Sequence, residues 1–510
     1  MKMPNRVLKV LAISALGLMV LGTIAPLSVY ADTVQSTDYQ RQTFTKVVDW
    51  YDYVRQYAAA NGLTPPNASE HAYLYTNYIN VGGYQLFYVG LVNVTNGGRF
   101  VTVPLQTFFQ HFKTPGGKDA LTASSFLSLV AFNESSTTTV PNSPDPSDNV
   151  YASFSLGVDL TSYLQNHAPS YVAGSQVIPL TQVGTNHWTW GLEYTNLSAI
   201  WWKITPDHLS PIYDPIPHGV ARYTELTFNY DLTLDPSTKA AHLTETFTIG
   251  KVTDLWVIRL LPTFIRHYNA TGSYYLNGTQ TPQSQTVYQI LQSGGYKLSV
   301  VLANKTILAS HTAADKDSSG NTVDDASSND LAHSNVTTTA DDGERVFQAD
   351  FSAKSTYQLY DSSDANPATY TITTRTVRRD GYGKNPLFAF QNRFMGFFPL
   401  FVAHVDPGLI QEAKAGLASF AVSDYLYTIS YPTWGGTKVV NDPDYTTFYQ
   451  PASNAGLLIV VFIAVAVAAV VGGVFAFLMR KRKTASMGMT TAPGQAPPTQ
   501  GPAGPAIPGR

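Results

Sequence analysis

A short acidic stretch holds the best candidate ligands of the chain. Asp315, Asp317, Ser319 and Asn321 alternate in a D-x-D-x-S-G pattern. Oxygen ligands at alternate positions suit Ca²⁺, and the glycine allows the sharp turn of a calcium loop. The twelfth position, however, holds Ala326 where a bidentate acidic ligand belongs. The pattern predicts either a Ca²⁺ site of altered geometry or a solvated acidic loop, and no other cofactor is expected.

A second group of potential ligands lies in a proline-rich stretch. It consists of Asp207, His208, Asp214 and His218. Two histidines and two aspartates could ligate zinc or a similar ion. Their spacing matches no specific metal motif, so turn-forming aspartates and surface histidines are the simpler interpretation.

Recognised catalytic signatures are missing from the sequence. It has no G-x-S-x-G elbow, H-E-x-x-H, P-loop or G-x-G-x-x-G. It also has no cysteine, which excludes thiol nucleophiles and thiolate metal sites. A carboxylate acid/base pair stays open among 35 acidic residues, because sequence spacing does not reveal such a pair. The sequence therefore favours a protein without enzymatic activity, and a carboxylate pair is the catalytic alternative that stays open.

Four of the seven tryptophans cluster within 15 positions, at Trp188, Trp190, Trp201 and Trp202. Trp188 and Trp190 would share one face of a strand. Such rings either fill a core or stack on a carbohydrate or peptide.

The charge distribution argues against nucleic acid as a partner. The net charge is −3, but residues 1–31 carry +3 and the tail after 479 carries +5. The segment between them therefore carries −11, which repels phosphate. Apolar residues make up 44% of the chain and charged residues only 13%. This composition predicts a folded, β-rich protein of a prokaryotic cell surface, with an archaeal host as one candidate.

Two apolar segments predict the topology. Residues 1–31 have a basic start, an apolar stretch and small residues before a cleavage site after Ala31, as in a signal peptide. Residues 455–479 contain no charged side chain, and at ~1.5 Å per residue they reach about 37 Å, enough to cross a bilayer. Arg480-Lys481-Arg482-Lys483 follows, which places the C-terminus in the cytoplasm. The tail 480–510 is rich in Pro and Gly and is expected to be disordered.

Eight Asn-x-Ser/Thr sequons lie between the predicted cleavage site and the membrane segment, at Asn67, Asn93, Asn133, Asn196, Asn269, Asn277, Asn304 and Asn335. If the host glycosylates, these positions should lie on exposed loops. Asn196 is the most doubtful, because apolar residues follow it closely.

The outer segment is predicted to open with an amphipathic helix. Thr37-x-x-Gln40 reads as a capping box, and apolar residues recur at helical spacing from Phe44 to Ala58. Asn61-Gly62 supplies the stop signal. This apolar stripe should pack on a sheet.

Strand signals dominate the rest of the outer segment. Arg222 to Leu234 alternates apolar and polar residues, and Asp235-Pro236-Ser237-Thr238 signals a turn. His242 to Ile249 alternates again, with Glu245 as an exception on the apolar face. Further strands are predicted at Phe100–Pro104, Phe126–Phe132, Tyr151–Leu160, Trp188–Tyr194, Tyr296–Ala303, Val346–Phe351, Tyr357–Tyr360, Tyr370–Val377 and Tyr425–Tyr431.

These elements predict a mainly β, sandwich-like extracytoplasmic region with an N-terminal helix and one transmembrane helix. The expected domains are 32–215, with helix and strands, and 216–453, which is β-rich. The leading hypothesis is a single-pass, membrane-anchored surface glycoprotein that serves binding, adhesion or envelope structure, with surface proteins or carbohydrates as partners. One alternative is a membrane-tethered extracellular hydrolase. The other is an accessory subunit of a membrane complex, which the apolar stretch Pro386–Val405 would favour.

Overall fold

The computed structural model describes residues 43–60, 62, 64–65, 67–69, 71–95, 106–136, 148–156, 174–204, 219–260, 263–275, 285–310, 312–317, 335–350, 355–359, 368–369, 373–378, 421–431 and 437–450. The expected signal peptide, the segment 455–479 and the tail lie outside these residues, as do Phe100–Pro104 and Pro386–Val405. Of the helices that the described residues form, none has the length and apolar character needed to cross a membrane.

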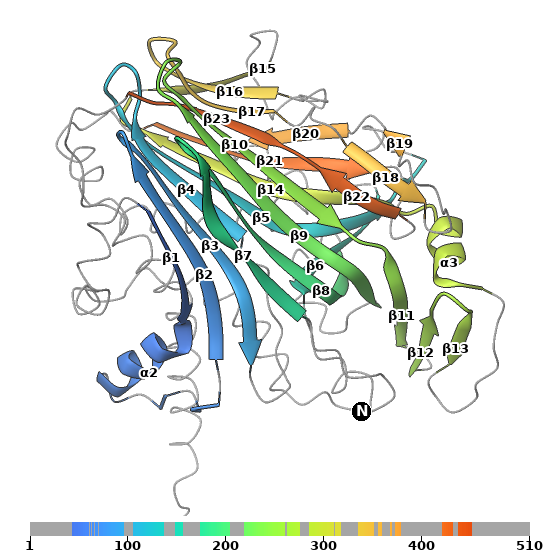
Figure 1. Cartoon of the computed structure of the whole chain (residues 1–510). Coiled ribbons are helices and arrows are strands. Elements are labelled where there is room, and N and C mark those ends of the chain that lie inside the picture. The colour runs from blue at the N-terminus through green and yellow to red at the C-terminus, as the bar shows by residue number, and fades with distance from the viewer. Residues whose placement is uncertain are drawn as a thin grey trace, which may run out of the picture.

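The described strands form two antiparallel layers that pack face to face, called sheet one and sheet two below (Figure 1). Sheet one consists of β1 (Thr43–Asp49), β2 (His71–Val81), β3 (Tyr84–Thr95), β4 (Gln106–Lys113), β5 (Asp119–Asn133), β14 (Lys297–Leu308), β21 (Ala421–Tyr431) and β20 (Thr373–Arg378), in that spatial order. The mainly β prediction is confirmed.

Sheet two is built around three long strands, β8 (His187–Ile204), β9 (Gly219–Asp235) and β10 (Ala240–Ile249). On one side β8 pairs with β7 (Gly174–Gly184). On the other side β10 pairs with β22 (Thr437–Asn441) and β23 (Asp444–Phe448). The outer strands are β11 (Val252–Leu260), β12 (Thr263–Tyr268), β13 (Ser273–Tyr275), β15 (Ala313–Asp317), β16 (Asn335–Ala340), β17 (Arg345–Asp350), β18 (Ser355–Leu359) and β19 (Ala368–Thr369).

Among the described strands, β6 (Asn149–Leu156) links the two sheets. It pairs with the end of β5 in sheet one and with the end of β8 in sheet two. Strand β5 can pair with both β4 and β6 along the same edge because β4 pairs only with the first half of β5. The layers are therefore continuous at this corner.

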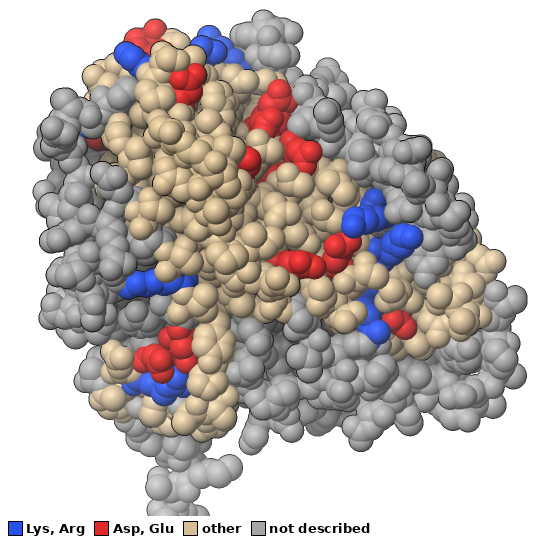
Figure 2. All heavy atoms as spheres, in the orientation of Figure 1, with Lys and Arg blue, Asp and Glu red and all other residues tan. Residues whose placement is uncertain are grey.

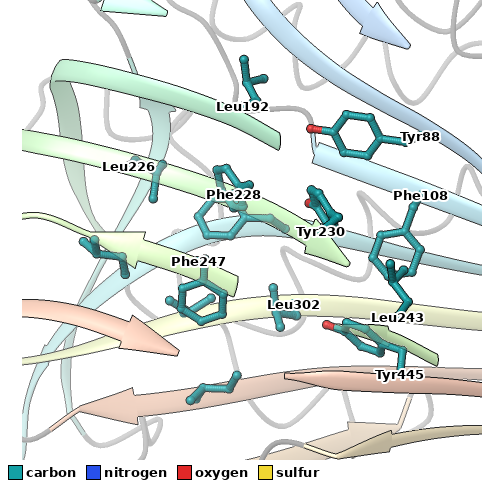
Figure 3. Packing of buried hydrophobic residues seen from close by; sticks show 14 of the residues in the cluster. Tyr88, Phe108, Leu192, Leu226, Phe228, Tyr230, Leu243, Phe247, Leu302 and Tyr445 are labelled. Atoms are coloured by element: carbon teal, nitrogen blue, oxygen red, sulfur yellow. The ribbon is translucent and has the colours of Figure 1, made fainter. Parts of the chain in front are cut away.

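The core lies between the sheets and is rich in aromatic rings (Figure 3). Across the interface, Tyr88 lies 4.9 Å from Tyr230 between ring centroids, and Phe126 lies 5.1 Å from Phe228. Rings of this size bury large apolar areas and favour such tilted contacts. The paired sheets are thus held by side chains that period-two alternation turns inward.

The hairpin expected from 222 to 249 is confirmed. Strand β9 pairs with β10 over ten residue pairs, from Asp235↔Ala240 to Leu226↔Ile249. The Asp235 carboxylate accepts hydrogen bonds from the Ser237 and Thr238 amides, as a turn-forming aspartate does. Most other predicted strands also coincide with described ones.

The predicted N-terminal helix is wrong in its first half. Residues 43–49 form β1, which pairs with β2, and the helix α2 (Trp50–Ala60) begins only after it. The spacing of apolar residues in 44–51 fits a helix, but pairing with the long neighbouring strand β2 overrides that local preference. The helix ends directly before Asn61-Gly62, and Gly62 has the positive φ of a helix stop.

One further helix, α3 (Val287–Ser293), was not among the predicted elements. Thr286 and Gln289 form a reciprocal capping box, with side-chain to backbone hydrogen bonds of 2.9 and 3.3 Å. The T-x-x-Q spacing was therefore a usable signal.

The expected boundary at 215/216 falls between two paired strands. β8 precedes it and β9 follows it, and they pair from His187↔Thr233 to Trp201↔Gly219. In sheet one, β5 and β14 also pair across it. The described residues of the two segments thus share one hydrophobic core.

Candidate functional site

One charged group lies in the space between the two sheets, the carboxylate of Glu245. Strand β10 turns Leu243, Glu245 and Phe247 to the space between the sheets, and Glu245 is 2% exposed. This residue is the exception on the apolar face of the predicted strand, so the sequence pattern located it without revealing its partners.

Two tyrosines enclose the Glu245 carboxylate. Tyr230, directly opposite on β9, donates a hydrogen bond of 3.0 Å to Oε1. Tyr445 on β23 donates one of 3.1 Å to Oε2. Tyr230 stacks on Trp190 at 5.3 Å, and Tyr445 packs on Phe108 at 5.3 Å. The two hydroxyl donors are thus fixed by aromatic packing on both sides.

Burial governs the proton equilibrium of this cluster. Loss of hydration raises the pKa of Glu245 to about 7, and the two tyrosine hydrogen bonds oppose that rise only in part. Burial also raises the pKa of Tyr230 and of Tyr445 well above the ordinary value. The carboxyl group therefore changes charge near neutral pH while both phenols stay protonated. The cluster is thus a buried carboxyl group that two phenol hydroxyls hold by hydrogen bonds.

Sheet one contributes polar side chains to the same interior. In the register of the sheet, Gln110 on β4, Thr122 on β5 and Thr306 on β14 form one row. Asn304 and Ser124 lie opposite each other in the neighbouring row, joined by a hydrogen bond of 2.8 Å. All five are buried. In proteins, buried polar atoms of this kind are commonly bridged by internal water molecules.

Hydrogen bonds between these polar groups and sheet two tie the layers together. Gln110 Oε1 accepts from Tyr84 of its own sheet and from Thr447 of β23, both at 2.6 Å. Gln106 Nε2 donates to the Tyr194 hydroxyl of β8 at 3.0 Å. Directional bonds of this kind fix how the sheets stack, which apolar contact alone leaves free.

The candidate calcium ligand Asp315 lies on β15, not in a loop. Its buried carboxylate accepts hydrogen bonds of 2.8 Å from Thr338 and from Ser423. Asp317 ends the same strand, whereas Ser319 and Asn321 lie outside the described residues. Asp207, His208, Asp214 and His218 lie outside them as well. Within the described ranges, no group of three or more His, Asp or Glu side chains could hold a metal ion.

A second charged cluster surrounds Asp254 on β11. Its carboxylate contacts His267 Nε2 at 2.9 Å and Arg222 at 3.2 Å. The His267 ring stacks on Trp256 at 4.6 Å and Arg222 lies over the same indole. Burial would raise the pKa of Asp254, but the bond from His267 and the charge of Arg222 outweigh it and lower the pKa. This arrangement fixes the outer strands β11 and β12 to β9.

The sequons fall into different environments. Asn67 and Asn196 are exposed, the latter despite the apolar residues that follow it. Asn304 contradicts the expectation of an exposed loop, because it is 1% exposed on the central strand β14. The folded chain has no room for a glycan there. Asn133, Asn269 and Asn335 are half-buried, the side chain of Asn93 is not described, and Asn277 lies outside the described residues.

Three of the four clustered tryptophans belong to the core. Trp188 and Trp190 share one face of β8, as predicted, and both are buried with Trp201. A buried indole face is not accessible to a sugar ring, so the carbohydrate-stacking interpretation fails for these three residues. The side chain of Trp202 is not described.

Fold and site together define a two-layered antiparallel β protein whose core contains buried polar and charged side chains. Comparison of the chain with protein-family models, with curated proteins and with solved structures finds no match.

Proposed function

We propose that the protein is a single-pass, membrane-anchored cell-surface protein whose outer part is the two-sheet body. Its role is binding, adhesion or envelope structure. The observation that carries this proposal is the position of the body in the chain. All described strands, from Thr43 to Phe448, lie between the apolar segments 1–31 and 455–479.

The interior of the body supports a structural rather than a catalytic role. Among the described residues, the buried carboxylates of Glu245 and Asp315 both accept hydrogen bonds from hydroxyl groups of other strands. A glycosidase would need two carboxyl groups that face a substrate across a cleft. Glu245 instead lies in the packed space between two sheets.

The exposed sequons Asn67 and Asn196 support the outward orientation of the body. Asn67 lies before β2 and Asn196 lies on β8, at exposed positions where a glycan would point to solvent. We expect glycans at these positions if the host modifies the motif.

Membrane anchoring is tested by two aspartates in the middle of the segment 455–479. Val465→Asp combined with Val467→Asp should cost about 5–7 kcal/mol of insertion free energy. The variant should appear in the medium, while the control Val465→Leu with Val467→Leu stays in the membrane pellet after an alkaline carbonate wash. Release of the wild-type chain by carbonate would contradict the proposal. Protection of the body from protease in sealed cells would contradict its orientation.

A further inference from the structure

The last described residues are held at one end of the body. The Tyr449 amide donates a hydrogen bond of 2.9 Å to the Lys239 carbonyl, and the Gln450 amide donates one of 2.7 Å to the Lys113 carbonyl. Lys239 is the last residue of the turn between β9 and β10 of sheet two, and Lys113 is the last residue of β4 in sheet one. The chain therefore leaves the body between the two sheets, with its exit point fixed to both.

At least four of the described turns surround this exit, and this part of the body is called the Gln450 end below. They are 82–83, 114–118, 236–239 and 341–344. The register places them together, because Tyr84 lies opposite Phe112 and Ala240 opposite Phe448. Lys118 binds Asp341 at 3.4 Å and Glu344 at 3.6 Å, which joins a turn of sheet one to a turn of sheet two.

The distance to the predicted membrane segment is short. Ala455 follows Gln450 by five positions, so a fully extended chain spans at most about 18 Å between them. Strand β2 alone has 11 residues and is about 35 Å long. The connection is thus shorter than the body. If the end opposite Gln450 rested on the membrane, Gln450 would lie farther from the membrane than the connection can reach. A body lying on its side is the orientation that competes with the upright one.

The geometry points to the Gln450 end as the face that rests on the lipid headgroups of the membrane in which the chain is anchored. This inference depends on the proposed membrane anchoring. In this orientation the body stands upright on the membrane, and α2 and the start of β2 lie at the end far from the membrane (Figure 1).

The surface of this end suits a headgroup layer. Side chains of both charges lie next to one another at the upper end of the body (Figure 2). On the two sides of the turn 114–118, Lys113 pairs with Asp119 at 3.0 Å. Val183 is 52% exposed and precedes the turn 185–186, which a hydrogen bond from Leu234 to Asn186 brings to the same end. Of the described residues, only Val183 and Val47 are exposed large apolar side chains. One such residue favours contact with headgroups over deep insertion.

Single cysteines test the orientation cleanly, because the natural chain has none. Ser237→Cys marks the Gln450 end and Ala68→Cys marks the opposite end, and both positions are exposed in turns. The full-length variants, labelled with a fluorophore, are reconstituted in phosphatidylcholine vesicles that carry a nitroxide on the lipid headgroup. Quenching at position 237 should exceed quenching at position 68 several-fold.

A longer connection provides the matched control. A flexible insert of 20 Gly and Ser residues after Gln450 adds about 25 Å of root-mean-square reach, so the difference between the two positions should shrink towards zero. Equal quenching without the insert, or stronger quenching at position 68, would overturn the upright orientation while leaving the anchor intact. Failure of the unlabelled chain to sediment with the vesicles would instead refute membrane anchoring itself.

Discussion

Tyr230 and Glu245 face each other directly across the β9–β10 hairpin, and the tyrosine hydroxyl donates a 3.0 Å hydrogen bond to the carboxylate. The same hairpin is the clearest one in the sequence. The strand pair that establishes sheet two therefore also places an ionisable group in its core. Tyr445 completes the enclosure from β23, whose neighbouring residues lead to the chain exit at Gln450.

Glu245 should make the fold more stable in acid than at neutral pH. Its pKa is about 7 in the folded chain, above the ordinary value of 4.5 that the unfolded chain retains. Between these values the unfolded state gives up a proton that the folded state keeps. Stability contributed by this group is thus fully present below pH 4.5 and falls as the pH rises to 7, by about 3 kcal/mol in total.

Glu245→Gln tests that dependence. The amide keeps a carbonyl acceptor for one tyrosine and cannot ionise, so the loss of stability between pH 4.5 and 7 should largely disappear. The measurement is thermal unfolding of the full chain in mild detergent at several pH values. The difference between variant and wild type isolates Glu245 from other groups that titrate. Parallel curves for the two proteins would rule out its raised pKa.

Tyr445→Phe removes one of the two donors to the carboxylate. We expect a loss of about 1–3 kcal/mol of folding free energy, because a buried acceptor is left with fewer hydrogen bonds. The loss should shrink in the Glu245→Gln background, since the two residues act through one contact. Tyr449→Phe is a suitable control, because Tyr449 packs on Tyr84 and not on Glu245. Additive effects of the two substitutions would show that the hydrogen bond contributes little.

Glycan occupancy should follow burial and not the sequon alone. In a host that glycosylates, glycopeptide mass spectrometry should find Asn67 and Asn196 modified and Asn304 unmodified. Asn304 is enclosed between β5 and β21, where its amide donates to Ser124. A glycan found on Asn304 would mean that modification precedes folding and that β14 is displaced from its place in sheet one.

The sequence predicts the parts of this fold that follow simple alternation. The β9–β10 hairpin is one example, since one face of each strand is apolar and the turn residues are typical. The inward face of sheet one is the opposite case. Thr122, Ser124 and Asn304 read as solvent-facing residues, yet they are buried against sheet two. Period-two patterns distinguish the faces of a strand by polarity, so they fail where a core is itself polar.

Glu245 shows how far the site itself could be predicted. The sequence marks it as an acidic residue on an apolar face, but its donor Tyr445 lies 200 positions away. Only the pairing of β10 with β23 brings the two together. Asp315 is the opposite case. A local loop motif predicts a calcium ligand, whereas strand pairing places the hydroxyls of Thr338 and Ser423 at its carboxylate.

Two aspartates of sheet two provide a last test, this time of surface electrostatics. Asp350 on β17 and Asp444 on β23 lie directly opposite each other, and like charges in such a pair are destabilising. Asp444→Asn should therefore stabilise the fold by about 0.2–1 kcal/mol at neutral pH and low salt, with less gain at high salt. Asp342→Asn is the matched control with the opposite sign, because it removes an ion pair with Lys118. Thermal unfolding of both variants at two salt concentrations measures the effect. A gain that salt leaves unchanged would assign the stabilisation of Asp444→Asn to packing or hydrogen bonding instead of charge repulsion.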